Sequence, residues 1–408
     1  MRKAFAPFTG RMPFFVSRGR GFVLKLNERA LIWIGPFGMD LIFSIYYLAA
    51  PLILIGLKAN PVELGLVGTI TSAVHMGMAH VTGRLSDRFG RRRLLITAPI
   101  LFAASCILMA SAQEIKFILA LSVINGLCMT LYWPPFQAWV ADQQTGPGLA
   151  RNIGDFNMSW TAANLTGPIL SGFLYSLYPR LPFFVAATLA LVLFLLIFAC
   201  VRDRRPLAAE GPKKTEVKGD ASQLHFLYAT WVANFASWFV IGNARYQFPK
   251  LARELDTSPQ WIGLLLGCIG FAMFSGFFML RRSEHWHFNK RYLLGAQFLA
   301  VAAALLISRA NSPGLFALAF ILLGTSCSVT YYSSLYYAVH LLKAKGKGSG
   351  LHESILGSGA VLGPILGGIA AQYIGLRAPY LLCFGVLLLA MAVEWILLVF
   401  RGHHTSFK

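Results

Sequence analysis

Charged side chains are scarce in this sequence. Asp, Glu, Lys and Arg make up 13% of the 408 residues, and hydrophobic residues make up 56%. A typical soluble domain has about 25% charged and about 45–50% apolar residues. With a mean hydropathy of +0.61, the composition argues against a water-soluble enzyme of two or three domains. The apolar stretches are long and unbroken, whereas the strands of a membrane β-barrel are short segments of alternating polarity.

Acidic residues are scarcer still, with 16 Asp and Glu against 36 Lys and Arg and a net charge of +20. In a soluble chain this excess would suggest nucleic acid, but in a membrane chain we expect no nucleic-acid partner. The six cysteines lie far apart inside apolar runs: Cys106, Cys128, Cys200, Cys268, Cys327 and Cys383. That spacing supports neither a metal site nor a disulfide framework, and we expect no metal and no cofactor.

Long apolar runs dominate the rest of the sequence. A helix that crosses the bilayer needs about 20 apolar residues, so these runs predict an all-α integral membrane protein with twelve transmembrane helices. The predicted spans are residues 31–57, 63–82, 94–112, 117–140, 154–175, 182–200, 223–249, 259–280, 292–308, 313–340, 350–372 and 379–400.

The one long polar break divides the predicted spans into two sets of six. The predicted divisions are a basic tail (1–30), a first half (31–200), a central loop (201–222), a second half (223–400) and a short tail (401–408). Most of the 36 Lys and Arg fall in the tails, the central loop and the loops on the same side. Cytoplasmic loops are the ones enriched in Lys and Arg. We therefore expect a multi-pass protein of the inner (plasma) membrane with both termini cytoplasmic.

The two halves resemble each other at a nearly constant offset. Pro51 aligns with Pro249, Gly65 with Gly263 and Gly126 with Gly324, and the run 167–172 falls on 363–368. Chance matching in apolar sequence is the alternative explanation, but prolines and glycines that match across a whole half favour a duplication. Two parallel six-helix repeats place a binding site near the middle of the membrane, between halves that rock to expose it alternately.

A conspicuous motif lies between the second and third predicted spans. The segment Gly83-Arg-Leu-Ser-Asp-Arg-Phe-Gly-Arg-Arg-Arg93 resembles the loop 2–3 signature of the major facilitator superfamily, G-x-L-a-D-r-x-G-r-r-x. With the internal repeat, the resemblance covers nearly the whole chain. It implies the twelve-helix fold of that family and transport of small solutes.

The resemblance also implies a conformational latch at the inner end of the spans, made by Gly83, Asp87, Arg88, Gly90, Arg91 and Asp142. Gly83 and Gly90 would let helix ends approach closely. Asp87 would face the start of span 11, whose dipole favours negative charge, and Arg91 would bridge Asp87 and Asp142. The simpler alternative is a positive-inside loop with one incidental acid. In the second half, His285 occupies the position equivalent to Asp87. The resemblance therefore implies a latch in the first half only.

Two further family patterns are met only in part. Many members have an arginine in span 4 that is linked to proton coupling, but Ser122 occupies that position here, so coupling must run elsewhere. The run Gly359, Gly363, Pro364, Gly367 and Gly368 in span 11 resembles the antiporter signature G-x-x-x-G-P-x-x-G-G, and span 5 matches it less well. This resemblance favours efflux by exchange.

Ionisable residues inside spans are candidates for function because they are costly to place in a membrane. Asp40 lies about ten residues into the first span, and burial disfavours its charged form, which makes it a candidate for proton coupling. The alternative is a structural partner of a polar neighbour. Arg245 aligns with Tyr47 across the repeat. Arg245 either extends to the membrane interface or contacts an anionic or polar substrate.

Aromatic and amide side chains inside the spans are candidates to line the substrate cavity. Asn157, Trp160 and Asn164 share one helical face, and aromatic pairs recur at matching places in spans 4 and 10. The complete set is Tyr47, Trp133, Asn157, Trp160, Asn164, Arg245, Tyr331, Tyr332 and Tyr336. Such a surface suits sugars or amphipathic drugs.

These observations predict a secondary active transporter that moves a small organic solute by alternating access, by proton-coupled efflux of a drug- or sugar-like compound. No ATP-binding loop of the G-x-x-x-x-G-K-[ST] type occurs, so a proton gradient, another ion gradient or the solute gradient would supply the energy. Uptake by symport or uniport is the alternative in the same fold. A non-transporting sensor or a membrane-embedded transferase fits less well, because no catalytic cluster is present in the sequence. We expect a monomer in the lipid bilayer that is not an enzyme.

Overall fold

The computed structural model describes residues 28–143, 147–201, 221–342 and 345–400, and within them the chain is helical. The first half contains α1 (Glu28–Gly56), α2 (Pro61–Phe89), α3 (Arg91–Ser111), α4 (Ile115–Gln143), α5 (Pro147–Leu177) and α6 (Leu181–Cys200). The second contains α7 (Ala221–Tyr246), α8 (Phe248–Glu254), α9 (Pro259–Leu280), α10 (Lys290–Arg309), α11 (Pro313–Leu341), α12 (Lys345–Tyr373), α13 (Ala378–Trp395) and the π-helical turn η1 (Ile396–Phe400).

The helices follow the apolar runs of the sequence. Eleven helices in the described residues are long and apolar enough to cross a membrane, and α5 is a twelfth long helix whose hydropathy does not reach that of the eleven. The fold is therefore the predicted twelve-span bundle. One predicted span is interrupted, because α7 ends at Tyr246 and the short α8 begins at Phe248. Pro249 in the first turn of α8 lacks the N–H that a continuous helix would use.

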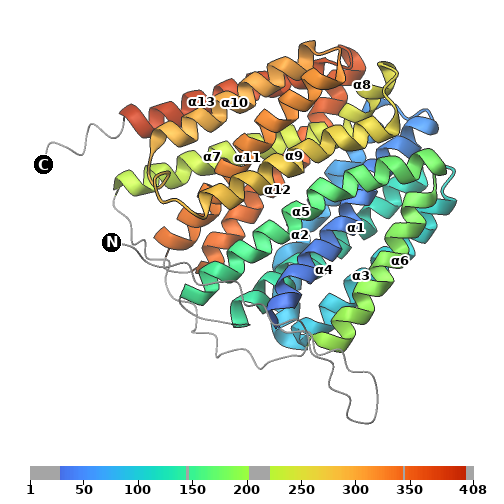
Figure 1. The fold of residues 1–408 in the computed structure, drawn as a ribbon, viewed down its shortest axis with the longest axis horizontal. Helices are drawn as coiled ribbons and strands as arrows, with labels where there is room; N and C mark the ends of the chain where they lie inside the picture. Colours follow the sequence, from blue (N-terminus) through green and yellow to red (C-terminus); the bar gives the residue numbers. More distant parts are fainter. Residues whose placement is uncertain (1–27, 144–146, 202–220, 343–344, 401–408) are drawn as a thin grey trace, which may run out of the picture.

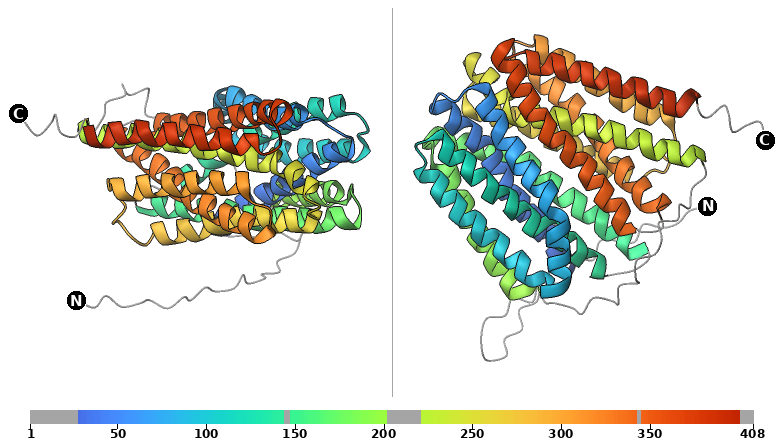
Figure 2. Two further views of the ribbon diagram at one scale, coloured as in Figure 1. Left: turned by 90° about the horizontal axis from the view of Figure 1, so that it is seen from above. Right: turned by 180° about the vertical axis from the view of Figure 1, so that it is seen from behind.

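The helices form two groups that lie side by side (Figure 1). Within the first group α1 packs on α5, α2 on α4 and α3 on α6, and in the second α7 packs on α12, α9 on α11 and α10 on α13. The views in Figure 2 place α3 and α6 on one flank and α10 and α13 on the opposite flank. The groups meet mainly through α5 with α9 and α2 with α12.

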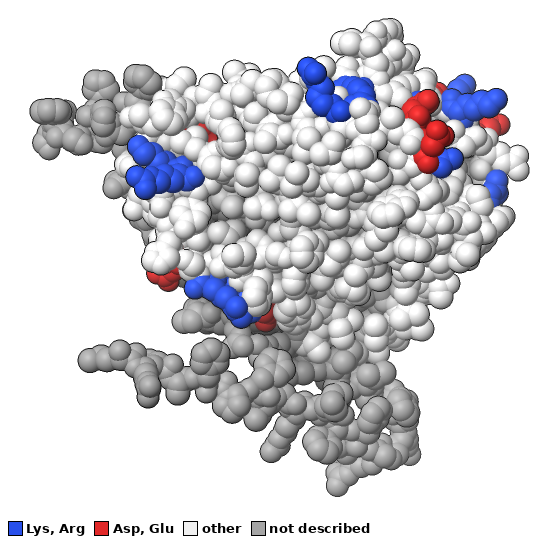
Figure 3. Space-filling model, turned by 45° about the horizontal axis from the view of Figure 1, so that its top comes forward, with Lys and Arg blue, Asp and Glu red and all other residues white. Residues whose placement is uncertain are grey.

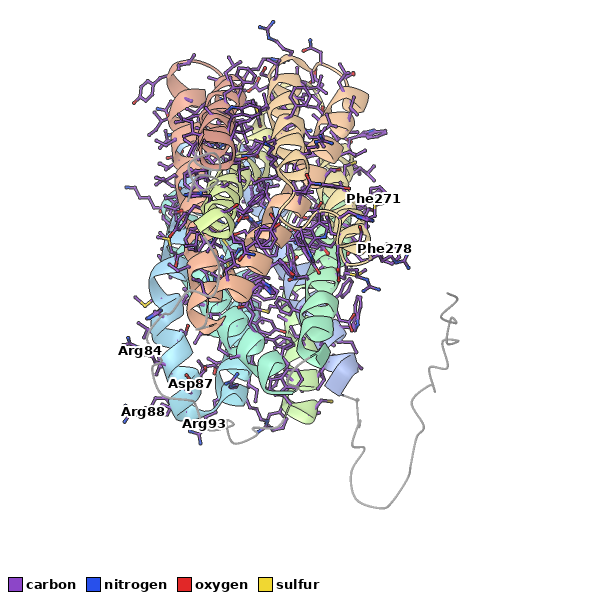
Figure 4. All side chains as sticks on the ribbon, turned by 90° about the vertical axis from the view of Figure 1, so that its left-hand side faces the viewer. Arg84, Asp87, Arg88, Arg93, Phe271 and Phe278 are labelled. Atoms are coloured by element: carbon purple, nitrogen blue, oxygen red, sulfur yellow. The ribbon has the colours of Figure 1, made fainter. Side chains whose placement is uncertain are left out.

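The surface has the character of a membrane protein. On the face in Figure 3, Lys, Arg, Asp and Glu gather toward the two ends, and a broad uncharged band lies between them. Phe271 and Phe278 of α9 point outward from the bundle (Figure 4), and Phe271 is 53% exposed. Side chains of this kind pack against acyl chains in a bilayer.

The two ends of the bundle differ. At one end, here called the basic end, α2 finishes with Arg84, Asp87 and Arg88, and α3 begins beside them (Figure 4). At the opposite end, here called the α8 end, the Gln247 amide before α8 donates a hydrogen bond of 3.0 Å to the Pro61 carbonyl at the start of α2. The Lys250 ammonium of α8 donates one of 2.6 Å to the Ala59 carbonyl.

The halves approach backbone to backbone at two glycines. A Cβ on Gly65 of α2 would collide with the carbonyl oxygen of Pro364 on α12, and a Cβ on Gly263 of α9 would collide with that of Pro168 on α5. These residues are counterparts in the internal repeat, so the interface is built twice from the same parts. Small residues permit this close approach of membrane helices.

Candidate functional site

A narrow pocket lies between the two halves. Its lining comes from α1, α5, α7 and α9: Ser44, Tyr47, Leu48, Asn164, Pro168, Trp238, Ile241, Arg245, Leu266, Ile269, Gly270 and Met273. The lining is mostly apolar, with Arg245 as its one formally charged member among these described residues. Pockets with apolar walls and a few convergent polar groups are the usual form of small-molecule sites.

A chain of polar contacts crosses from one half to the other beside the pocket. The Asn164 side-chain amide on α5 donates a short hydrogen bond to Oδ2 of Asp40 on α1. The Arg245 guanidinium on α7 donates a hydrogen bond of 2.8 Å to Oδ1 of Asn164. Ser44, one turn after Asp40, donates to the same carboxylate oxygen at 3.3 Å. Asp40, Asn164 and Arg245, three separate predictions from the sequence, thus form one connected group.

Aromatic rings hold Arg245 in place. Its guanidinium carbon lies 4.7 Å from the ring centroid of Tyr47 on α1 and 5.6 Å from that of Trp238 on α7. Cation–π contacts of this kind favour the charged guanidinium at a partly desolvated site. Arg245 therefore points into the bundle between the halves, and the alternative of extension to the membrane interface is not what the structure shows.

A second layer of aromatic side chains packs beside this group. Trp160 of α5 lies 5.5 Å from Tyr331 of α11, and Trp238 lies 6.4 Å from Tyr331, measured between ring centroids. The Trp160 indole N–H donates to Oδ1 of Asn157 at 3.1 Å. Trp160, Tyr331 and Asn157 are all buried, so they shape the site next to the pocket lining.

The remaining predicted cavity residues lie elsewhere. Trp133 packs on Tyr132 and Phe156 within the first half, with centroid distances of 5.4 and 5.9 Å. Tyr332 and Tyr336 pack around Trp286, at 5.4 and 5.2 Å, in the loop between α9 and α10 at the basic end. None of these three side chains belongs to the described pocket lining.

The predicted latch is described in part. Arg91 and Asp87 form an ion pair of 3.6 Å, with the Asp87 side chain 66% exposed, and Arg88 lies over Phe89 at 5.3 Å. Gly90 has a φ of 89°, which is the conformation that lets α3 start directly after α2. Gly83 differs from expectation, because a Cβ there would meet open space. The side chain of Asp142 lies outside the described residues, so its role stays a prediction.

The glycine–proline run of α12 packs against two helices. A Cβ on Gly363 would meet the Phe239 carbonyl, one on Gly367 the Asn243 side chain, and one on Gly368 the Pro61 carbonyl. Pro364 is the residue that Gly65 approaches. The run thus forms the surface by which α12 contacts α7 and α2.

Sequence reasoning missed several residues that complete the site. Trp238 was not singled out, although the repeat offset that aligns Tyr47 with Arg245 also aligns Asp40 with Trp238. At the basic end, Arg281, directly after α9, pairs with buried Asp155 of α5 at 3.8 Å, and Gln137 of α4 donates a hydrogen bond of 3.2 Å to Glu353 of α12. Asp155 and Glu353 stand out in the sequence as acids at the starts of spans 5 and 11, where they either are favoured by the helix dipole or take part in gating, but no motif marks their partners Arg281 and Gln137.

Comparison with known proteins gives a consistent result. Residues 32–280 and 230–406 match the family model described as Major Facilitator Superfamily. The chain is 25% identical over 361 residues to a multi-drug resistance efflux pump PmrA homolog of Lactococcus lactis, which covers 85% of this chain and 89% of that protein. It is 21% identical over 388 residues to the quinolone resistance protein NorA of Staphylococcus aureus, covering 92% and 98%.

The fold also matches solved structures. A bacterial homolog of the human lysosomal transporter Spinster, in an inward-facing and occupied conformation, superimposes with a TM-score of 0.73 at 15% identity. The match covers 90% of this chain and 96% of that one.

Proposed function

Since the chain belongs to the major facilitator superfamily of transporters, we propose that it exports small amphipathic organic solutes in exchange for protons, with Asp40 as the coupling carboxyl. The family match confirms the resemblance seen in residues 83–93. The efflux direction is supported by the names of the relatives from Lactococcus lactis and Staphylococcus aureus. The glycine–proline run of α12 is consistent with exchange.

The observation that carries the proposal is the position of Asp40. Asp40 is 7% exposed, and among the described residues its hydrogen bonds reach the second half through the amide of Asn164 and the guanidinium of Arg245. A carboxylate accepts these contacts well, whereas a protonated carboxyl accepts a hydrogen bond less strongly. Proton uptake by Asp40 would therefore weaken a link between the halves, which is what coupling to alternating access requires.

Transport in proteoliposomes tests this function. Protein is reconstituted, and accumulation of a fluorescent quinolone and of ethidium is followed with the interior acid, the exterior acid or no gradient. Exchange predicts that an acid interior drives accumulation, because protons leave as solute enters. Accumulation driven by an acid exterior would instead indicate symport, and no gradient-dependent flux of either probe would refute coupled transport of these solutes.

The role of Asp40 is tested by Asp40→Asn, which keeps the shape and removes the titrating group. We expect the variant to lose gradient-driven accumulation while it still equilibrates solute by counterflow. Asp256→Asn is the matched control, because Asp256 is exposed at the α8 end and has a φ of 54° that asparagine also tolerates. Equal gradient dependence in Asp40→Asn and wild type would remove Asp40 from coupling.

A further inference from the structure

Arg245 carries a positive charge into the pocket, and no carboxylate of the described residues forms an ion pair with it. In the described part of the chain, the ion pairs within 4.0 Å join Arg91 with Asp87 and Arg281 with Asp155. Arg245 instead contacts the Asn164 amide oxygen and the faces of Tyr47 and Trp238. It is only partly buried and lines the pocket. A guanidinium in such a place is a ready partner for a carboxylate, which it can bind with two parallel hydrogen bonds.

The carboxylate of Asp40 lies on the other side of the Asn164 amide from Arg245. Asp40 Oδ2 accepts both the Ser44 and the Asn164 hydrogen bonds, which leaves Oδ1 for a proton or a cationic group. The Asn164 side-chain amide is oriented by two hydrogen bonds: its NH₂ donates to Asp40, and its oxygen accepts from Arg245. The Asn164 amide therefore separates a positive group that lines the pocket, Arg245, from a buried negative group behind the lining, Asp40.

Whether the proton and the solute move in the same direction or in exchange decides which solute fits this arrangement. An anion on Arg245 alone would bind better when Asp40 is protonated and neutral, so proton and solute would travel together. Exchange requires the opposite, that solute and proton compete. A solute with a protonated amine competes with the proton for Asp40, and a carboxylate on the same molecule pairs with Arg245.

We propose that the pocket selects dipolar solutes, in which a carboxylate binds Arg245, a protonated amine binds Asp40, and both displace the Asn164 amide from its bridging position. The largely apolar lining from Leu48, Ile241 and Met273 and the ring of Trp238 would contact the apolar part of the solute. This inference rests on the proposed exchange function, because the competition with a proton assigns the amine to Asp40.

Three compounds that differ at one group each test the proposal by equilibrium binding to purified protein in detergent. The parent is a fluorescent quinolone with a carboxylate and a secondary amine. Its methyl ester lacks the negative charge, and its N-acetyl derivative lacks the positive one. Hydrogen bonds to charged groups predict that each derivative binds about 10- to 100-fold more weakly than the parent. Equal binding of all three compounds would overturn the proposal.

Protein variants assign each charge to its partner. Arg245→Gln should weaken binding of the parent about tenfold or more and leave binding of the ester unchanged. Arg245→Lys should retain part of the affinity for the parent. Asp40→Asn should weaken the parent but not the N-acetyl derivative. Arg309→Gln, at the exposed end of α10, is the control for loss of an arginine. Intact ester binding shows that Arg245→Gln is folded, and an equal loss for parent and ester would make Arg245 a structural residue.

Binding and transport separate the two levels of the proposal. If the parent binds with the expected dependence on both charges but no gradient drives flux, the proposed exchange fails. If gradient-driven flux is observed and the ester or N-acetyl compound binds and is transported like the parent, the exchange function is supported and the dipolar selection is wrong.

Discussion

Adjacent residues of one helix serve different regions of the molecule, as Tyr331 and Tyr332 of α11 show. Tyr331 contacts Trp160 and Trp238 beside the pocket, whereas Tyr332 contacts Trp286 at the basic end. Consecutive side chains of a helix point about 100° apart, so a pair of tyrosines in the sequence cannot both face one small site. The sequence identifies such rings as interior, but only the packing of neighbouring helices shows which of them lies beside the pocket.

This difference predicts separate effects of two matched substitutions. Tyr331→Ala should weaken binding of the quinolone probe several-fold, since aromatic contacts contribute about 0.5–1.5 kcal/mol beyond the area they bury. Tyr336→Ala should leave the binding constant unchanged, because Tyr336 stacks on His287 and His340 outside the pocket. Fluorescence titration measures both. Equal losses in the two variants would contradict the assignment.

A histidine in the loop between α9 and α10 predicts a pH effect on stability. Partial burial lowers the pKa of His287 below its usual 6.5, with Glu284 opposing and His340 reinforcing the shift. The unfolded chain then binds a proton more readily than the folded one, so stability is lost as the pH falls through about 6.5. Thermal unfolding between pH 7.5 and 5.5 measures this loss.

The substitution His287→Gln isolates that effect. It should reduce the pH dependence of the unfolding temperature in this window, whereas His285→Gln, at an exposed position two residues earlier, should not. An unchanged pH dependence in His287→Gln would show that other groups are responsible.

At the scale of whole helices, the sequence predicts most of the fold because the apolar runs are long. Each predicted span lies on an observed helix, and the predicted duplication matches the two packed groups. The exceptions have local causes. Pro249 separates α8 from α7, and α5 does not reach the hydropathy of the eleven candidate spans because it carries polar residues that include Asn157 and Asn164. Hydropathy alone ranks such a helix poorly, although its polar face is what places it at the site.

The backbone contacts between the halves predict a sharp effect of a single methyl group. Gly263→Ala should prevent close approach of α9 to the Pro168 carbonyl, and overpacking of this kind costs about 1–3 kcal/mol. We expect the α8 end to close less well and gradient-driven transport to fall severalfold. Gly295→Ala on α10 is the control, because a Cβ there meets nothing within 4 Å. A transport rate of Gly263→Ala equal to that of Gly295→Ala would contradict this packing argument.

At the scale of the whole molecule, the site exists only where the two halves meet. Asp40, Tyr47, Asn164 and Arg245 were each identifiable in the sequence as unusual residues within spans. Their connection depends on how α1 and α5 of one half face α7 of the other, which no local pattern specifies. The repeat supplies part of this information, since Tyr47 and Arg245 are counterparts and stack on each other across the interface.

The two ends of this interface differ in their contacts. At the α8 end the contacts are close backbone approaches, of Gly65 to Pro364 and of Gly263 to Pro168, and hydrogen bonds from the Gln247 and Lys250 side chains to backbone carbonyls. At the basic end they are polar, and include the pair of Asp155, 5% exposed, with Arg281. An ion pair whose arginine side chain is 36% exposed can break and form as the halves rock.

The last prediction concerns this pair as a gate at the basic end. In a cysteine-free background with Ser44→Cys in the pocket lining, Asp155→Asn and Arg281→Gln should each speed labelling by a charged thiol reagent applied from the basic end. Restoring the pair with reversed charges, Asp155→Arg with Arg281→Asp, should return labelling toward the wild-type rate. Arg282→Gln is the control, since this neighbouring arginine lies over Phe278 at 3.8 Å rather than across the interface. Labelling that is the same in all variants would show that the Asp155–Arg281 pair does not restrict access to the pocket.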